Sequence, residues 1–346
     1  MDSLSQIVLG AAVGEAALGK KVGNRAILWG AIAGTLPDMD VLLRFFVDEI
    51  TATQWHRGFS HSILFCVLCA PLLGWIAKKI HKRLEEVSFK SWSWMFFWIL
   101  LTHPLLDAQT TWGTQLFWPL EYKLAFQNIF VIDPLYTLPF LVMLIVAMFY
   151  KRTHPKRRLF NNLGLIISSS YLILSFGFKA MAHSAFKNAL TDQKIEYVEL
   201  DTKPTPLNTI LWNAFVQTAN GYRIAYYSLF DGSPIHFSKE YSNNHDLLDP
   251  YKDQKVVQQL INISNGWYIV EKADKHLLFW DIRFGQAGID PDQSPFIWCY
   301  QLTIAEDGLV SAKRKRPSFC HYAGLVKSSR YLLPSRWQAQ CRQQQA

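Results

Sequence analysis

The chain has 346 residues, which is enough for two domains. Hydrophobic residues make up 50% of it, and 35 Lys and Arg against 27 Asp and Glu give a formal net charge of +8. Such a basic balance can indicate nucleic-acid binding. Here, however, the basic residues form short clusters between apolar segments, a pattern typical of membrane proteins. We therefore expect a membrane protein and no nucleic-acid partner.

Apolar segments fill the first half of the chain. They cover residues 4–18, 26–46, 62–77, 92–106, 129–150 and 159–182. The first has only 15 residues, whereas a helix needs about 20 to span a bilayer, and the second is interrupted by Pro37. We predict an α-helical polytopic membrane domain over residues 1–183, with about six apolar segments, some of them short or broken.

Basic clusters at residues 20–25, 78–83 and 151–158 separate these segments. Because cytoplasmic loops are enriched in Lys and Arg, we expect all three clusters on the cytoplasmic side. The loops at 47–61 and 107–128 then lie outside. The chain beyond the last apolar segment then also lies outside. This topology also brings three polar motifs, around Asp38, His61 and His103, to one level of the membrane.

Beyond residue 184 the pattern changes to alternation. Two runs alternate with the residues between them. The first consists of Phe296, Trp298, Tyr300, Leu302 and Ile304, and the second of Leu278, Trp280, Ile282 and Phe284. Runs of period two that are rich in aromatic residues predict half-buried strands. We therefore predict that residues 184–346 form a mainly antiparallel β domain that is soluble and extracytoplasmic.

Two features of this C-terminal domain have more than one interpretation. A disulfide among Cys299, Cys320 and Cys341 is neither required nor excluded by the sequence. The basic run Lys313–Arg316 suits a solvated turn or a contact to anionic head groups better than a nucleic-acid signal.

The first polar motif, Pro37-Asp-Met-Asp40, interrupts the second apolar segment. Ionisable groups are costly beside lipid, so they usually mark a site or a water-filled cavity. Pro37 stiffens the turn. Asp38 and Asp40 either bind a metal ion, with one of them orienting another ligand, or cap the end of a short helix.

The second motif, Trp55–Ser62, places His56, Arg57 and His61 close together. Gly58 indicates a loop that leads into the third segment, and in a loop both imidazoles can turn inward. The two histidines either bind a metal ion or form a hydrogen-bonded pair at the interface. Arg57 either neutralises a phosphate or carboxylate of a substrate or extends along the lipid to the interface.

The third motif contains His103 and Asp107, which are four residues apart and therefore stacked on one helix face. This spacing suits two metal ligands, or one ligand held by a carboxylate. Residues 110–115 follow directly and are expected to fold over the site. Because the three motifs meet at one level, together they favour a metal centre.

A divalent metal ion, zinc before manganese or magnesium, suits a set of His and Asp ligands, and the absence of Cys argues against a structural zinc site. The predicted ligands are Asp38, Asp40, His56, His61, His103 and Asp107. A bound ion would lower the pKa of water and polarise a carbonyl or phosphoryl oxygen. We expect Arg57, His61 and Asp107 to carry the catalysis, and Gln6 and Glu15 either to complete the polar lining or to join helices.

These motifs resemble the YdjM/YbcI family of bacterial inner-membrane proteins, which are described as metal-dependent hydrolases. The resemblance covers about residues 1–182, and His56–Ser62 is its most specific part. It implies metal ligation by the six residues just named and a distant likeness to α-helical zinc-dependent phospholipases C. Many members have Thr-His where this chain has Ser5-Gln6, so a ligand role is not carried over to residue 6. The family's motifs do not explain residues 184–346.

The leading hypothesis is a membrane-embedded metal-dependent hydrolase that uses metal-activated water on a lipid-borne ester or phosphoester. It implies a multi-pass protein of the bacterial inner membrane, a periplasmic C-terminal domain and a lipid or lipid-linked substrate. The alternative is a non-catalytic, metal-stabilised anchor that presents the β domain to an envelope partner; its metal site would be closed. A transporter would spread polar residues through the membrane depth, whereas here they lie mainly in the outer half.

Overall fold

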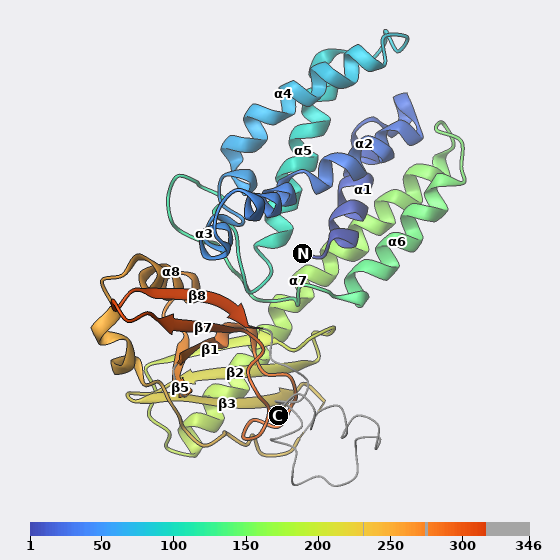
Figure 1. Ribbon diagram of the computed structural model, residues 1–346. Helices are drawn as coiled ribbons and strands as arrows, with labels where there is room; N and C mark the ends of the chain where they lie inside the picture. Colours follow the sequence, from blue (N-terminus) through green and yellow to red (C-terminus); the bar gives the residue numbers. More distant parts are fainter. Residues whose placement is uncertain (231, 274–275, 316–346) are drawn as a thin grey trace, which may run out of the picture.

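A computed structural model of the protein describes residues 1–230, 232–273 and 276–315. The chain has a helical part and a β-rich part, and the long helix α7 runs from one into the other (Figure 1). The helical part consists of α1 (Ser3–Val22), α2 (Asn24–Thr35), the 3-10 helix η1 (Pro37–Phe45), α3 (Glu49–Trp55), the 3-10 helix η2 (Phe59–His61), α4 (Ile63–Ile80), α5 (Phe89–Asp107), α6 (Pro134–Met148) and α7 (Pro155–Asp192).

Two of the described helices, α4 and α7, are long and apolar enough to cross a membrane. The pair α2 and η1 adds a third span if its 43° bend is a break within one span, and α6 is a shorter apolar helix. Pro37 begins η1 and has no backbone N–H to continue the bonding pattern of α2, which explains this break. The helical, apolar character of this part is confirmed, but the predicted number of six spans is not.

Close packing of α1 on α2 places η1 near the start of the chain. A Cβ atom on Gly10 would lie 2.4 Å from the carbonyl oxygen of Gly30, and one on Gly30 would lie 2.2 Å from that of Gly10. Only glycine allows the two backbones to approach so closely, as at other interfaces of small residues between membrane helices. The hairpin thereby sets Asp38 of η1 beside the C-terminal end of α5, 3.5 Å from His103 Nε2.

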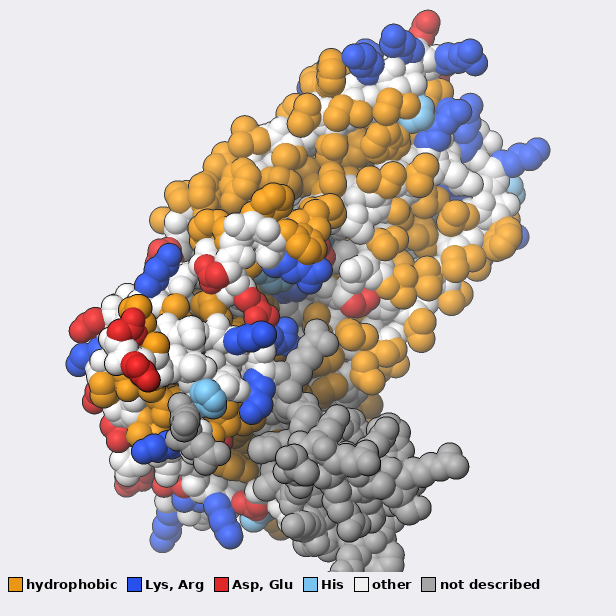
Figure 2. Space-filling view, viewed as in Figure 1, with side chains coloured by type: hydrophobic (Ala, Val, Ile, Leu, Met, Phe, Trp, Pro, Cys, Tyr) orange, Lys and Arg blue, Asp and Glu red, His pale blue; other side chains and the backbone are white. Residues whose placement is uncertain are grey.

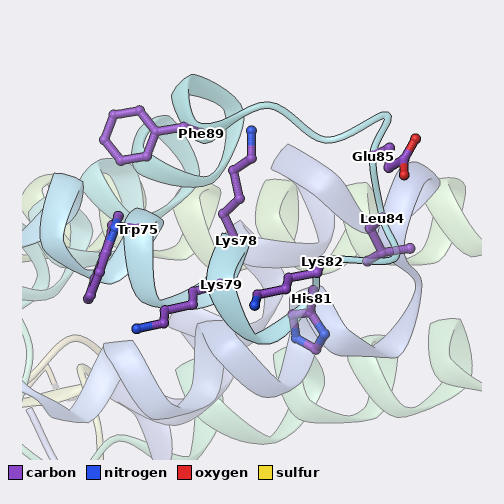
Figure 3. Close-up of a pocket in the computed structure, with 8 residues that line it drawn as sticks. All are labelled: Trp75, Lys78, Lys79, His81, Lys82, Leu84, Glu85 and Phe89. Carbon is purple, nitrogen blue, oxygen red and sulfur yellow. The ribbon is translucent and has the colours of Figure 1, made fainter.

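The three basic clusters lie at one end of the helical part, and the β-rich part lies at the other (Figure 2). At the basic end, the guanidinium of Arg152 donates to the carbonyl of Lys21 at 2.7 Å, which joins two of the clusters. The third cluster lines a hollow of about 490 Å³, where Figure 3 shows Lys79 beside Trp75 and Lys82 beside His81. This separation is the arrangement that the charge pattern predicted.

The β-rich part contains two four-stranded antiparallel sheets, ordered β1-β2-β3-β4 and β5-β6-β7-β8. Helix α7 runs past residue 183, where the membrane domain was predicted to end, and packs on the first sheet. The strands are β1 (Glu199–Pro204), β2 (Leu211–Gln217), β3 (Gly221–Ser228), β4 (Tyr241–Ser242), β5 (Tyr268–Ala273), β6 (His276–Asp281), β7 (Cys299–Ile304) and β8 (Val310–Lys315), accompanied by η3 (His245–Tyr251), α8 (Lys255–Ser264) and η4 (Ile282–Phe284).

The predicted antiparallel β domain is therefore confirmed for the described residues, but the two alternating runs are only partly strands. Ile282 and Phe284 lie in η4, and Phe296 and Trp298 precede β7. Cys299 is buried and is a free thiol. Cys320 and Cys341, the other two cysteines of the possible disulfide, lie outside the described residues, as does Arg316 of the basic run. Lys313, the first residue of that run, lies within strand β8 rather than in a turn.

The β-rich part contacts helix α3, which leads into the second polar motif, and the loop that follows the third. Gln259 of α8 donates to the hydroxyl of Thr51 at 3.1 Å and to the side-chain carbonyl of Gln54 at 2.8 Å, both in α3. Trp112, in the loop after α5, stacks on Phe284 with ring centres 5.5 Å apart. The β domain thus fixes the loop segments that lead to the site.

Candidate metal centre

Four of the six predicted ligands converge. Asp38 comes from η1, His61 from η2, and His103 and Asp107 from successive turns of α5; one donor atom from each lies within 4.8 Å of all the others. The side chains of His61, His103 and Asp107 are at most 1% exposed, and that of Asp38 is 26% exposed. The predicted stacking of His103 and Asp107 on one helix face is thus observed, with Asp38 on the side that solvent can reach.

The spacing of the four donor atoms suits one ion. His61 Nε2 lies 3.2 Å from His103 Nε2, 3.3 Å from Asp107 Oδ2 and 3.4 Å from Asp38 Oδ1. His103 Nε2 lies 3.4 Å from the same Asp107 oxygen and 3.5 Å from the same Asp38 oxygen. Ligands bound at roughly 2.0–2.2 Å in a tetrahedron are about 3.4 Å apart. The donor set and its spacing therefore fit a divalent cation.

Hydrogen bonds on the outer side of each imidazole direct its inner nitrogen to the centre. His103 Nδ1 donates to the carbonyl of Gly34 at 2.6 Å, which leaves the lone pair on Nε2. His61 Nδ1 lies 2.9 Å from Ser60 Oγ, which in turn donates to Asp40 Oδ2 at 2.9 Å. His61 Nδ1 is therefore the donor in the first contact, and its Nε2 also presents a lone pair. Such outer partners are typical of metal-binding histidines.

Asp107 has one oxygen that no hydrogen bond satisfies. Its Oδ1 accepts from the amide of Gln6 at 3.0 Å and from the amino group of Met1. Its Oδ2 is buried and has no hydrogen-bond partner among the described residues, although Arg57 Nε lies 3.2 Å away. A buried carboxylate oxygen without a partner is costly. A cation among the four donors would remove this cost and separate the two facing imidazole lone pairs.

Asp40 and His56 lie outside the four-residue group. His56 Nδ1 is 2.9 Å from Asp40 Oδ1, and its ring centre is 6.0 Å from that of His61. Asp40 Oδ2 also accepts from the backbone N–H of Arg57 at 2.9 Å. The structure thus places Asp40 behind His61, where it can orient that imidazole through Ser60, in keeping with the supporting role considered for one residue of the Asp pair.

Arg57 points from the loop towards Asp107 and the segment after α5. Its guanidinium donates to Thr110 Oγ1 at 3.0 Å, and its carbonyl accepts from the backbone N–H of Gln115 at 3.0 Å. Its side chain is buried and its φ of 61° is in the left-handed region, a strained conformation for an arginine. The segment at 110–115 therefore folds over the site, as predicted, and holds Arg57 at its edge.

The two polar residues of α1 have separate roles. Gln6 contacts Asp107, so residue 6 lies at the cluster and offers an amide there. Glu15 is far from it and forms a buried pair with Arg157 of α7, with both contacts at 2.6 Å. Two contacts at the cluster could not be read from the sequence: that of the Gly34 carbonyl with His103 and that of Thr110 Oγ1 with Arg57. A backbone carbonyl leaves no signal in a sequence, and a single threonine in a loop leaves little.

A family model described as YdjM inner membrane protein matches residues 1–183, more than half of the chain and all four converging donors. The chain belongs to the YdjM inner membrane protein family. Inner membrane protein YbcI of Escherichia coli (strain K12) is 35% identical over 103 residues, which are 29% of this chain and 57% of that relative. The chain thus spans little more than half of the relative's length. No solved structure matches this chain.

Membership of the YdjM family agrees with the resemblance carried by the three motifs and makes this chain an inner-membrane protein by family. The matched residues end where the apolar segments end, so the match does not include the β-rich part. The contacts of α8 and η4 with α3 and with the loop after α5 therefore come from residues outside the matched part.

We expect Asp40→Asn to weaken metal binding by about 10–100-fold, the usual effect of losing a carboxylate that supports a ligand histidine. Competition with a chelating dye on the purified full chain would measure this affinity. Asp246→Asn, an exposed change in η3, is the matched control and should bind metal as the wild type does. Equal affinities for the Asp40 and Asp246 variants would show that Asp40 does not support His61.

Proposed function

We propose that this YdjM-family protein is a membrane-embedded, metal-dependent hydrolase that acts on a lipid-borne ester or phosphoester. The observation that carries the proposal is the buried group of Asp38, His61, His103 and Asp107, with a partnerless carboxylate oxygen and an arginine at its edge. A bound divalent ion would supply water of lowered pKa and polarise a phosphoryl or carbonyl oxygen.

The residues around the donors have distinct proposed roles. Arg57 is within reach of Asp107 and lines a cavity beside the cluster, so its planar guanidinium can hold a phosphoryl oxygen. Asp40 and Ser60 hold the outer nitrogen of His61. Burial of the donors excludes bulk water and strengthens every charge interaction there.

Zinc is the proposed ion, because two imidazoles and two carboxylates at these spacings suit tetrahedral coordination. Four protein ligands alone would make a closed site, the arrangement expected of a non-catalytic anchor. The 26% exposure of the Asp38 side chain favours catalysis over that alternative. Water can reach the donor set from this side, and zinc can expand to five ligands during a reaction.

The surface next to the cluster supports a lipid-borne substrate. Phe45, the last residue of η1, and Phe46, which follows it, are 69% and 83% exposed. Trp55 and Phe59 flank the loop that carries Arg57. Exposed aromatic residues of this kind mark the boundary between lipid and water. With the basic clusters in the cytoplasm, this boundary is that of the outer leaflet, and the β domain is periplasmic.

Hydrolysis by the full chain in lipid nanodiscs tests the proposal. With zinc, manganese or magnesium supplied in turn, we expect release of phosphate from dioleoylphosphatidic acid or of nitrophenol from bis(p-nitrophenyl) phosphate. Arg57→Met should lower kcat/KM by about 100-fold, the loss typical of removing one group that stabilises transition-state charge. Arg158→Met, at the basic end, should have no effect. A metal-loaded wild type that hydrolyses no ester or phosphoester would favour the anchor instead.

A further inference from the structure

A cavity of about 870 Å³ lies between the helical part and the β domain, beside the candidate metal centre. Asp40, His56 and Arg57 line it on the helical side. Arg283 and Trp298 line it on the β side. Its size is within the range of ligand-binding pockets. Neither half of the chain forms this cavity alone, because both parts contribute lining residues.

Two cationic side chains, those of Arg283 and Lys123, lie close to the indole of Trp112, which lines the cavity. The guanidinium of Arg283 lies 5.8 Å from the ring centre, and Lys123 Nζ, which borders an adjoining hollow, lies 5.1 Å from it. Asp281 pairs with Arg283, whereas Lys123 has no ion-pair partner among the described residues. Burial, together with the charges of Arg283 and Arg57, lowers the pKa of Lys123 to about 8. An anion placed here would relieve this repulsion.

Apart from the charged side chains of Arg44, Glu49, Lys203 and Arg314, the remaining walls are mainly apolar. They include Val41, Phe130, Val131 and Ile289. Val41 and Ile289 are 47% and 68% exposed, and Val41 lies on the same η1 helix as the exposed Phe45. Figure 2 shows Lys and Arg side chains gathered where the apolar helical surface meets the β domain. An occupant of this cavity would have both an anionic and an apolar portion.

We propose that the cavity binds a phosphate-bearing amphiphile, with its phosphate near Arg57, Arg283 and Lys123 and its acyl or prenyl portion along the apolar wall. As the identity of the substrate, this inference rests on the proposed hydrolase function; as a binding site, it can be tested without turnover. It assigns the β domain the role of completing the substrate site of a helical hydrolase.

Isothermal titration calorimetry on the full chain in phosphatidylcholine nanodiscs tests the binding site. The probe is the phosphonate analogue of dihexanoylphosphatidic acid, whose carbon–phosphorus bond resists hydrolysis, and empty nanodiscs give the partitioning background. Dihexanoylglycerol lacks the anion, and inorganic phosphate lacks the apolar portion. We expect each of these two to bind at least about tenfold more weakly than the phosphonate.

Arg283→Gln keeps a hydrogen bond to Asp281 within reach and should weaken phosphonate binding more than about tenfold. Lys123→Gln lies in a loop and should weaken it at least about threefold. Lys252→Gln, an exposed change on the β domain, is the matched control and should bind as the wild type does. The inference is overturned if Lys123→Gln and Arg283→Gln bind like this control, or if inorganic phosphate binds as tightly as the phosphonate.

Metal content measured on the same samples separates this inference from the proposed function. Phosphonate binding by protein that takes up no metal, even when zinc, manganese and magnesium are supplied, would support the cavity as a binding site and contradict the metal-dependent hydrolase. Metal-loaded, hydrolytically active protein that does not bind the phosphonate would contradict the cavity and leave the hydrolase standing.

Discussion

Replacing His61 with alanine is expected to reduce the metal content of the purified protein from about one equivalent to background. His61 Nε2 is within 3.4 Å of the donor atoms of the other three residues, so its loss opens the middle of the set. Losing a direct ligand should weaken affinity by more than the about 100-fold that loss of a supporting residue causes. Mass spectrometry of metals, on full chain purified by size-exclusion chromatography, gives the number of metal ions per protein chain.

The matched control for this substitution is His236→Ala. Its side chain is 71% exposed on the β domain, where it pairs with Asp292, and the variant should retain the wild-type metal content. Thermal unfolding of both variants in the same detergent tests whether metal loss merely follows misfolding. Full metal content in His61→Ala would contradict the assignment of this histidine as a ligand.

Replacing Glu15 with alanine is expected to destabilise the helical part by about 3–5 kcal/mol, because it leaves the guanidinium of Arg157 buried without a counter-charge. The two side chains are 5% and 3% exposed, and they join α1 to α7 through two contacts of 2.6 Å. A lower thermal midpoint and a shift to lower denaturant concentration would measure the loss. Metal content, in contrast, should change only as far as folding does.

The double variant Glu15→Met with Arg157→Met is the control for that prediction. Replacing a whole buried ion pair by apolar side chains of similar size is often neutral or even stabilising. The double variant should therefore regain most of the stability that Glu15→Ala loses. Equal instability of the single and double variants would show that helix packing at this site matters more than the unpaired charge.

Much of the candidate site could be predicted from local sequence alone. His103 and Asp107 are stacked because an α-helix places residues four apart on one face, and Pro37 predicted the break that turns Asp38 towards them. The three motifs arrive at one level because their segments alternate in direction between basic clusters. Periodicity of two likewise predicted the antiparallel strands around Trp280 and Tyr300.

The rest depended on contacts that no local pattern encodes. Asp38 and Asp40 are two residues apart in η1, and only the three-dimensional path of that 3-10 helix decides which one reaches the four-residue group. His56 is held away from it by Asp40. Glu15 and Arg157 are 142 residues apart, so a pair between them was invisible. Arg283 lines the cavity beside the candidate metal centre only because the β domain packs against the helical part, and no sequence pattern predicts that packing.

X-ray absorption at the zinc edge, on zinc-loaded full chain in nanodiscs, tests the central claim most directly. The account predicts a first shell of nitrogen and oxygen ligands at about 2.0–2.1 Å, with the outer-shell scattering of two imidazoles. His103→Ala should reduce that outer-shell scattering by half or remove the zinc altogether. A spectrum of fully hydrated zinc, or one with no imidazole contribution, would contradict a metal centre built from His61 and His103.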